Sequence, residues 1–370
     1  MAAPEVLSPA ALNRATLARQ LLLERSSLGV ADAVARLVSL QAQFARPVSA
    51  GLWSRVTGVE AGTVAALAAD GVLVRATLMR HTLHVVTAAD YLAFRRVVQP
   101  GVARAFESMA GARVAAVDRE AVLAAVRARL SAGPATQKEL RDVAAGLVPG
   151  GDESALGYLA RTYTELVQVP SGRGWGWPAQ PPYARPADAL GREPAADPDP
   201  APLVRRYLAA FGPASVRDVQ TWSGLTGLGA VLDRLRDELM TFAAEDGREL
   251  FDLPDAPRPD PAEVAAPPRL LPEFDNLVVA HHDRSRLMDE DARRAVSRPG
   301  ARVLPSFLVD GRVAGTWRVD VAAKVATVTL TPFGRLRAAD RRALLAEAEG
   351  MARLLEPGAR DHAATVLATP

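Results

Sequence analysis

A short internal repeat constrains the fold of this chain more than any other feature of its sequence. Residues 133–140 read Gly-Pro-Ala-Thr-Gln-Lys-Glu-Leu, and residues 212–219 read Gly-Pro-Ala-Ser-Val-Arg-Asp-Val. Each copy has a hydroxyl residue followed three positions later by an acid, which is the pattern of a capping box at a helix start. Each copy therefore predicts a turn and then a short helix, and the two regions of the chain should fold alike.

The residues after the two copies predict the same order of elements. The expected helix and strands are 153–166, 166–170 and 175–178 after the first copy, and 227–238, 239–243 and 249–253 after the second. Helix, turn, helix and β-hairpin is the order of elements in a winged helix.

The N-terminal segment fits the same template less closely. Ser8 and Pro9 predict a helix start, because Ser is a good N-cap and Pro suits the first helical position. The elements expected after it are helices at about 31–42 and 60–70 and paired strands at 72–79 and 81–87. The sequence thus predicts three helix–helix–wing units before residue 255.

The last third of the chain has a different pattern. Its expected elements are strands at 277–281, 302–309, 312–317 and 325–332 and a terminal helix at 337–355. Asp310-Gly311 is a strong signal for a two-residue hairpin turn. Two proline-rich stretches, 178–202 and 254–272, cannot be internal helices or central strands and are expected to be linkers or surface connections.

The expected fold class is mainly α with α+β elements. Tandem winged-helix units would be followed by a C-terminal β-rich α+β module. The expected domains are a first unit at 1–110, a second at 111–180, a linker at 181–202, a third unit at 203–255 and the C-terminal module at 256–370.

Composition excludes several classes of chemistry. The chain has no Cys, so it can form no disulfide, Cys-ligated zinc site, iron–sulfur cluster or thiol nucleophile. His81 and His84 should point to opposite faces of a strand, so we expect no metal site. We find no phosphate-binding or dinucleotide-binding fingerprint and expect no cofactor. No run of 18 apolar residues and no signal-peptide core is present, so we expect an intracellular protein without a membrane partner.

The segment Leu40-Gln41-Ala42-Gln43 carries the sharpest chemical signal. Two side chains at this spacing diverge by about 200° on a helix, so they can converge only where the helix ends. Pro47 discourages a helix just before it, which allows such an end. Two carboxamides supply hydrogen-bond donors and acceptors but no base, so they suit the holding of a water molecule. A polar helix C-terminus without a chemical role is the alternative.

A glycine-rich stretch, 172–177, contains Arg173, Trp175 and Trp177 and reads as a hairpin tip. Its side chains could press on a nucleic-acid groove. The two tryptophans could equally pack on a neighbouring domain.

Three stretches together resemble the AlkZ-like DNA glycosylases, within the wider winged-helix glycosylase family that includes the YcaQ-like proteins. They are 40–43, the run 80–87 (Arg-His-Thr-Leu-His-Val-Val-Thr) with Asp90-Tyr91, and 271–276 (Leu-Pro-Glu-Phe-Asp-Asn) with 283–286 (Asp-Arg-Ser-Arg). YcaQ-like proteins have Gln–apolar–Asp in the first motif, and Gln43 places this chain with the AlkZ-like branch.

The resemblance implies a winged-helix fold around a concave DNA channel and a monofunctional glycosylase. The substrate would be double-stranded DNA with cationic N7-alkylated purines, including bulky adducts or interstrand crosslinks, in repair or self-resistance. A cationic purine leaves as a neutral base, so the reaction needs no general acid. The sugar becomes oxocarbenium-like, so water needs placing more than deprotonating. Gln41 and Gln43 are the expected catalytic residues.

The expected DNA contacts are mostly arginines, which fix the register of a protein on DNA through phosphates. These candidates are Arg46, Arg55, Arg75, Arg80, His84, Arg173, Trp175, Arg284 and Arg286. We expect a monomer in the bacterial cytoplasm, associated with the nucleoid when bound to DNA. Two other functions fit the pattern of elements, namely a DNA-binding regulator without catalysis and a scaffold that binds partner proteins.

Overall fold

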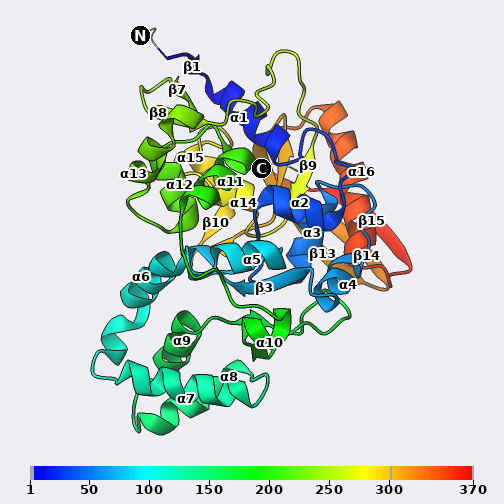
Figure 1. The fold of residues 1–370 in the computed structure, drawn as a ribbon. Helices are drawn as coiled ribbons and strands as arrows, with labels where there is room; N and C mark the ends of the chain where they lie inside the picture. Colours follow the sequence, from blue (N-terminus) through cyan, green and yellow to red (C-terminus); the bar gives the residue numbers. More distant parts are fainter. Residues whose placement is uncertain (1–3, 301, 369–370) are drawn as a thin grey trace.

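A computed structural model describes residues 4–300 and 302–368, and helices predominate over small sheets (Figure 1). The first unit contains α2 (Val30–Leu37), β2 (Leu40–Gln41), α3 (Arg46–Trp53), α4 (Thr63–Ala69), β3 (Leu73–Thr77), the 3-10 turn η1 (Met79–His81) and β4 (Leu83–Thr87). The connection to the second unit contains α5 (Ala88–Phe94), α6 (Gln99–Ala110) and η2 (Gly111–Val114).

The two repeat copies begin equivalent helices, as the sequence predicts. The second unit contains α7 (Arg119–Ser131), α8 (Gln137–Leu147), α9 (Glu153–Tyr163), β5 (Val167–Gln168) and β6 (Tyr183–Ala184), and α10 (Pro186–Leu190) follows it. The third contains α11 (Ala201–Phe211), α12 (Val216–Ser223), α13 (Leu228–Arg234), η3 (Arg236–Glu238), β7 (Met240–Ala244) and β8 (Glu249–Asp252). Both predicted capping boxes are confirmed, one at the start of α8 and one at the start of α12.

Strand pairing recurs in the three units. In each unit the residue or strand before the second helix pairs with the last strand of the hairpin. The pairs are β2 with β4, Ala135 with Tyr183, and Ala214 with Phe251. The three units therefore share one order of elements and one order of strands.

The C-terminal module is built on a five-stranded sheet with the order β15-β14-β13-β12-β9. Its elements are β9 (Arg269–Leu271), α14 (Asn276–Val279), α15 (Glu290–Val296), β10 (Ser297–Arg298), β11 (Arg302–Val303), β12 (Ser306–Val309), β13 (Arg312–Ala322), β14 (Val325–Pro332), α16 (Ala338–Leu355) and β15 (Asp361–Val366). The predicted Asp310-Gly311 turn is confirmed, and both of its residues have positive φ, as this turn type requires.

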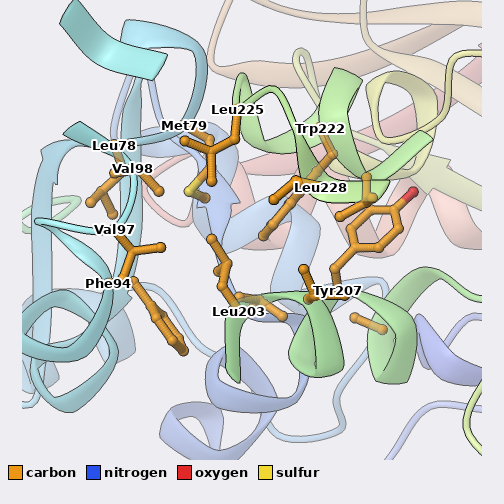
Figure 2. Close-up of a cluster of buried hydrophobic side chains, with 14 of the residues drawn as sticks. Leu78, Met79, Phe94, Val97, Val98, Leu203, Tyr207, Trp222, Leu225 and Leu228 are labelled. Carbon is orange, nitrogen blue, oxygen red and sulfur yellow. The ribbon is translucent and has the colours of Figure 1, made fainter. Parts of the chain in front are cut away.

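Shared cores join the modules. Residues of η1, α5 and α6 pack with α11–α13 in one cluster that includes Met79, Val98, Tyr207 and Trp222 (Figure 2). A second cluster joins α2–α4 to the C-terminal sheet and α16. The second unit has its own core, and α7–α9 lie at one end of the molecule (Figure 1). The first unit, which carries the glutamine motif, is therefore held between the third unit and the C-terminal module.

The structure corrects several sequence-based boundaries. The second helix ends at Leu37 and not near residue 42, and residues 276–279 are helical where a strand was expected. In the second unit the strand that pairs with β5 is β6, inside the predicted linker, and not 175–178. Trp177 is buried in the cluster of the first unit, and its indole N–H donates to the Gln168 carbonyl of β5 at 3.2 Å, so this segment contacts β5 through a side chain and β6 takes the pairing position.

The N-terminal helix also lies elsewhere than expected. The sequence predicts that helix α1 (Pro9–Arg19) belongs to the first unit. Instead, β1 (Val6–Leu7) pairs with β7 of the third unit, and Arg19 of α1 forms a buried ion pair with Asp252 of β8. Ser8 caps α1 as predicted.

Candidate active site

Gln41 and Gln43 lie on a short strand and its extension, and not at a helix end. Gln41 pairs with His84 of β4, and the Ala42 N–H donates to the Leu83 carbonyl at 2.7 Å, which continues the pairing by one residue. Gln43 follows in a bend, and its side chain turns back toward β4. Both glutamine side chains therefore contact the segment 80–83. Both side chains are half-buried.

Gln43 completes the pairing of β2 with β4 through its side chain. Its Oε1 accepts a hydrogen bond from the Leu83 N–H at 3.0 Å. The backbone carbonyl of Ala42 is occupied by Arg75, so the glutamine side chain takes the position of a strand acceptor. This bond fixes which end of the carboxamide faces β4.

Arg75 holds the motif from the other face of the sheet. On β3 it is the register partner of Val85, whereas Gln41 shares its face with His84. Its Nε donates to the Ala42 carbonyl at 2.8 Å, and its Nη2 donates to the Gln43 carbonyl at 2.9 Å. Burial lowers its pKa to about 10. Arg75 therefore shapes the motif, which corrects its assignment as a DNA contact.

Arg80 contacts Gln41 directly. Its Nη2 donates to Gln41 Oε1 at 2.8 Å, and its Nη1 donates to the carbonyl of Trp222 in α12. Burial, and then the charge of Arg284, lower the Arg80 pKa to about 10, so the side chain remains a cation at neutral pH. Two N–H groups of this half-buried guanidinium are thus bonded to protein acceptors, and the predicted DNA contact of Arg80 stays a prediction.

His84 is fully buried beside Gln41. Its Nδ1 lies 3.1 Å from the Thr82 carbonyl, which can only accept, so Nδ1 carries the proton. Burial, and then the charge of Arg80, lower the pKa of His84 to about 3. The ring is neutral at physiological pH and is out of reach of DNA, contrary to expectation.

Comparison with known proteins identifies the family. The family model described as "DNA glycosylase AlkZ-like" matches residues 34–354. The chain belongs to the AlkZ-like DNA glycosylase family. Membership of this family makes the AlkZ-like protein an enzyme of the DNA glycosylase class. The family resemblance that its motifs indicate is therefore confirmed.

A curated sequence and a solved structure from Streptomyces sahachiroi are similar to this AlkZ-like chain. A curated protein named "Interstrand DNA cross-link repair glycosylase" is 24% identical over 371 residues, which cover 91% of this chain and 95% of the relative. The solved structure of "Streptomyces sahachiroi DNA glycosylase AlkZ" matches with a TM-score of 0.77 and 22% identity over 98% of this chain and 100% of that chain. The structural match shows that the two chains share a fold.

Two further arginines predicted to bind DNA are structural in this AlkZ-like fold. Arg55 is fully buried in a two-point ion pair with Asp275, at 2.7 and 2.8 Å. Arg286 is buried and donates to the Thr16 hydroxyl at 3.1 Å and the Pro213 carbonyl at 3.0 Å. Neither side chain can reach a phosphate from these positions.

The remaining candidates lie nearer the surface. Arg173 is exposed, and Trp175 is half-buried against the cluster that contains Trp177. Arg284 is half-buried, and its charge acts on Arg80. Arg46 is paired with Glu356 at 2.5 Å.

Arg46 also lines a cavity of about 420 Å³ between the start of α3 and the C-terminal sheet. Arg302, Arg318, Glu273 and apolar side chains such as Trp317 line it as well, whereas Gln41 and Gln43 do not.

A hydrogen bond from Asn276, which the sequence does not predict, holds the backbone at the start of the motif. Asn276 Nδ2 donates to the Ser39 carbonyl at 2.6 Å, directly before β2. The sequence does single out Asn276, because this residue ends one of the stretches that carry the family resemblance, but only the fold shows that its partner is Ser39.

Within residues 4–300 and 302–368, no group of three or more His, Cys, Asp or Glu side chains is arranged to hold a metal. No helix in the same ranges is long and apolar enough to cross a membrane.

Proposed function

We propose that this protein is a monofunctional DNA glycosylase that hydrolyses the N-glycosidic bond of cationic N7-alkylated purines in double-stranded DNA. One observation carries the proposal. The side-chain carbonyl oxygens of Gln41 and Gln43 each accept a hydrogen bond from the segment 80–83. Both carboxamides are thus held in defined orientations against the same short segment.

The arrangement suits a reaction that needs a placed water rather than a strong base. An N7-alkylated purine is a cation and leaves as a neutral base, so no side chain has to protonate it. Each glutamine carbonyl has a second lone pair and each amide has two N–H donors, so the pair can both accept from and donate to one water. Positioning of this kind can supply a large part of a rate enhancement.

We propose further that the three recurring units are winged helices that surround a concave DNA channel, and that one copy of the chain is enough to bind DNA. Arg46, Arg173 and Arg284 are the candidates for phosphate contacts. The S. sahachiroi relative named for interstrand crosslink repair supports bulky adducts or crosslinks as substrates.

Incubation with a duplex that contains a single N7-methylguanine tests the proposal. We expect alkali-labile abasic sites at the lesion and none in a matched duplex with a neutral lesion such as uracil. A duplex joined by an N7-guanine crosslink from a nitrogen mustard should be separated into single strands after treatment. Binding to the alkylated duplex without abasic sites would instead identify a regulator. Failure to bind any duplex at low salt would instead identify a protein-interaction scaffold.

A further inference from the structure

The connection between β3 and β4 contacts all three recurring units. Arg80 in this connection reaches the Trp222 carbonyl at the end of α12 in the third unit. His81 Nε2 lies 2.9 Å from the Thr162 hydroxyl in α9 of the second unit, and that hydroxyl donates its own proton to the Tyr158 carbonyl. His81 is therefore the donor in this contact.

The backbone of this connection is held in an unusual conformation. Arg80 and His81 have φ values of 55° and 61°, in the left-handed region that residues other than glycine rarely adopt. Residues in this region persist where the surrounding structure holds them. Gly224 packs so closely against this connection that a Cβ atom there would lie 3.2 Å from the backbone nitrogen of Arg80. Met79 is buried in the same cluster as Trp222 and Leu225 (Figure 2).

The chemistry of Arg80 determines which end of the Gln41 carboxamide it contacts. A glutamine amide has nearly the same shape when its oxygen and nitrogen are exchanged, so hydrogen-bond partners alone select its orientation. Arginine has only donors, so it can bond only to Oε1. Because the guanidinium is charged, this bond is stronger than one between neutral groups. The amide nitrogen of Gln41 is thereby turned away from Arg80.

We propose that Arg80 is a positioning residue for the glycosylase reaction, which sets the orientation of the Gln41 carboxamide by bridging it to the Trp222 carbonyl and makes no contact with DNA phosphates. The inference rests on the proposed function of Gln41 and Gln43. It assigns a role within the site to a residue whose type and place in the sequence suggest a phosphate contact.

Single-turnover excision of N7-methylguanine, measured with enzyme in excess, tests this role. Arg80→Met keeps most of the apolar stem and removes the donors, and we expect the excision rate to fall about 100-fold or more. The dissociation constant for the duplex should stay within about twofold, and its salt dependence should not change. A phosphate contact would instead lower affinity and reduce the slope of log K against log salt by about one.

Arg104→Met is the matched control. Arg104 is an exposed arginine that donates to the Gly224 carbonyl at 2.9 Å, near the same end of α12, but has no bond to Gln41. We expect this variant to excise at the wild-type rate. A loss of rate equal to that of Arg80→Met would show that the end of α12, and not Gln41, is responsible, and would overturn the inference.

A double-mutant cycle asks whether Arg80 acts through Gln41. In a Gln41→Ala background, Arg80→Met should slow excision by less than about twofold, because the group that Arg80 orients is already absent. Independent, multiplicative losses would overturn the inference. If Arg80→Met unfolds in thermal melting, Arg80→Lys decides instead, because it keeps the charge but cannot bridge both acceptors. Wild-type excision by Arg80→Lys would refute the proposed role, whereas an inactive wild-type protein would refute the proposed function itself.

Discussion

Mild acid should destabilise this protein, because His84 is buried as a neutral ring. In an unfolded chain His84 would protonate near its ordinary pKa of 6.5, whereas burial and the charge of Arg80 lower its pKa in the folded protein to about 3. Between these values the unfolded state binds one more proton than the folded state. The contribution of His84 to the free energy of unfolding is therefore fully present above pH 6.5 and declines as the pH falls toward 3. Each pH unit is equivalent to about 1.4 kcal/mol. The roughly 1.5 units down to about pH 5.0 therefore amount to about 2 kcal/mol from His84 alone.

Urea denaturation at about pH 7.5 and about pH 5.0 measures this effect, with His84→Phe as the control. Phe keeps an aromatic ring and cannot titrate, and the Thr82 carbonyl keeps its bond from the Leu78 N–H at 3.0 Å. His281 is also buried with a lowered pKa, so both proteins should lose some stability in acid. The wild-type protein should lose about 2 kcal/mol more than the variant. Equal losses in the two proteins would show that His84 does not stay neutral in the folded state and would refute the reasoning.

Three other substitutions test the site and its support. Gln43→Ala should slow excision about 100-fold or more at unchanged DNA affinity, and should lower the free energy of unfolding by about 1 kcal/mol because Leu83 loses its acceptor. A parallel loss of affinity would mark Gln43 as a DNA contact. Asp275→Ala should lower the free energy of unfolding by about 3–5 kcal/mol, because it leaves the Arg55 charge buried, and a loss below about 1 kcal/mol in urea would contradict this. Gly224→Ala should slow excision at constant DNA affinity, since φ is 77° there and the added Cβ would press on the segment that holds Gln41. Wild-type excision by this variant would show that the close packing has no effect on the site.

Features encoded by neighbouring residues were predicted correctly from the sequence. The capping boxes at Thr136 and Ser215 and the turn at Asp310-Gly311 are confirmed, because each depends on hydrogen bonds or φ values within about four residues. The strand at 325–332 and the terminal helix are also where the hydrophobic pattern places them.

Errors arose where a distant partner decides the local structure. The two-residue strand that carries Gln41 exists because β4 pairs with it, and no periodic pattern can reveal so short a strand. The segment 175–178 contacts β5 through the Trp177 indole, while β6, which lies further along the chain, takes the pairing position.

The sequence by itself determined the family, the helix starts of the two repeat copies and the presence of the two-glutamine motif, because these are properties of residue type and spacing. Only the tertiary structure decided what the arginines do. Arg55, Arg75, Arg80 and Arg286 look like phosphate contacts in a list of residues, yet each is bonded to protein acceptors that lie far away in the chain or across a sheet. The physical reason is that an arginine side chain carries a positive charge at every position in the fold, so its residue type does not reveal its partner. Whether it contacts solvent, a carboxylate or a glutamine amide depends on which surfaces the fold brings together.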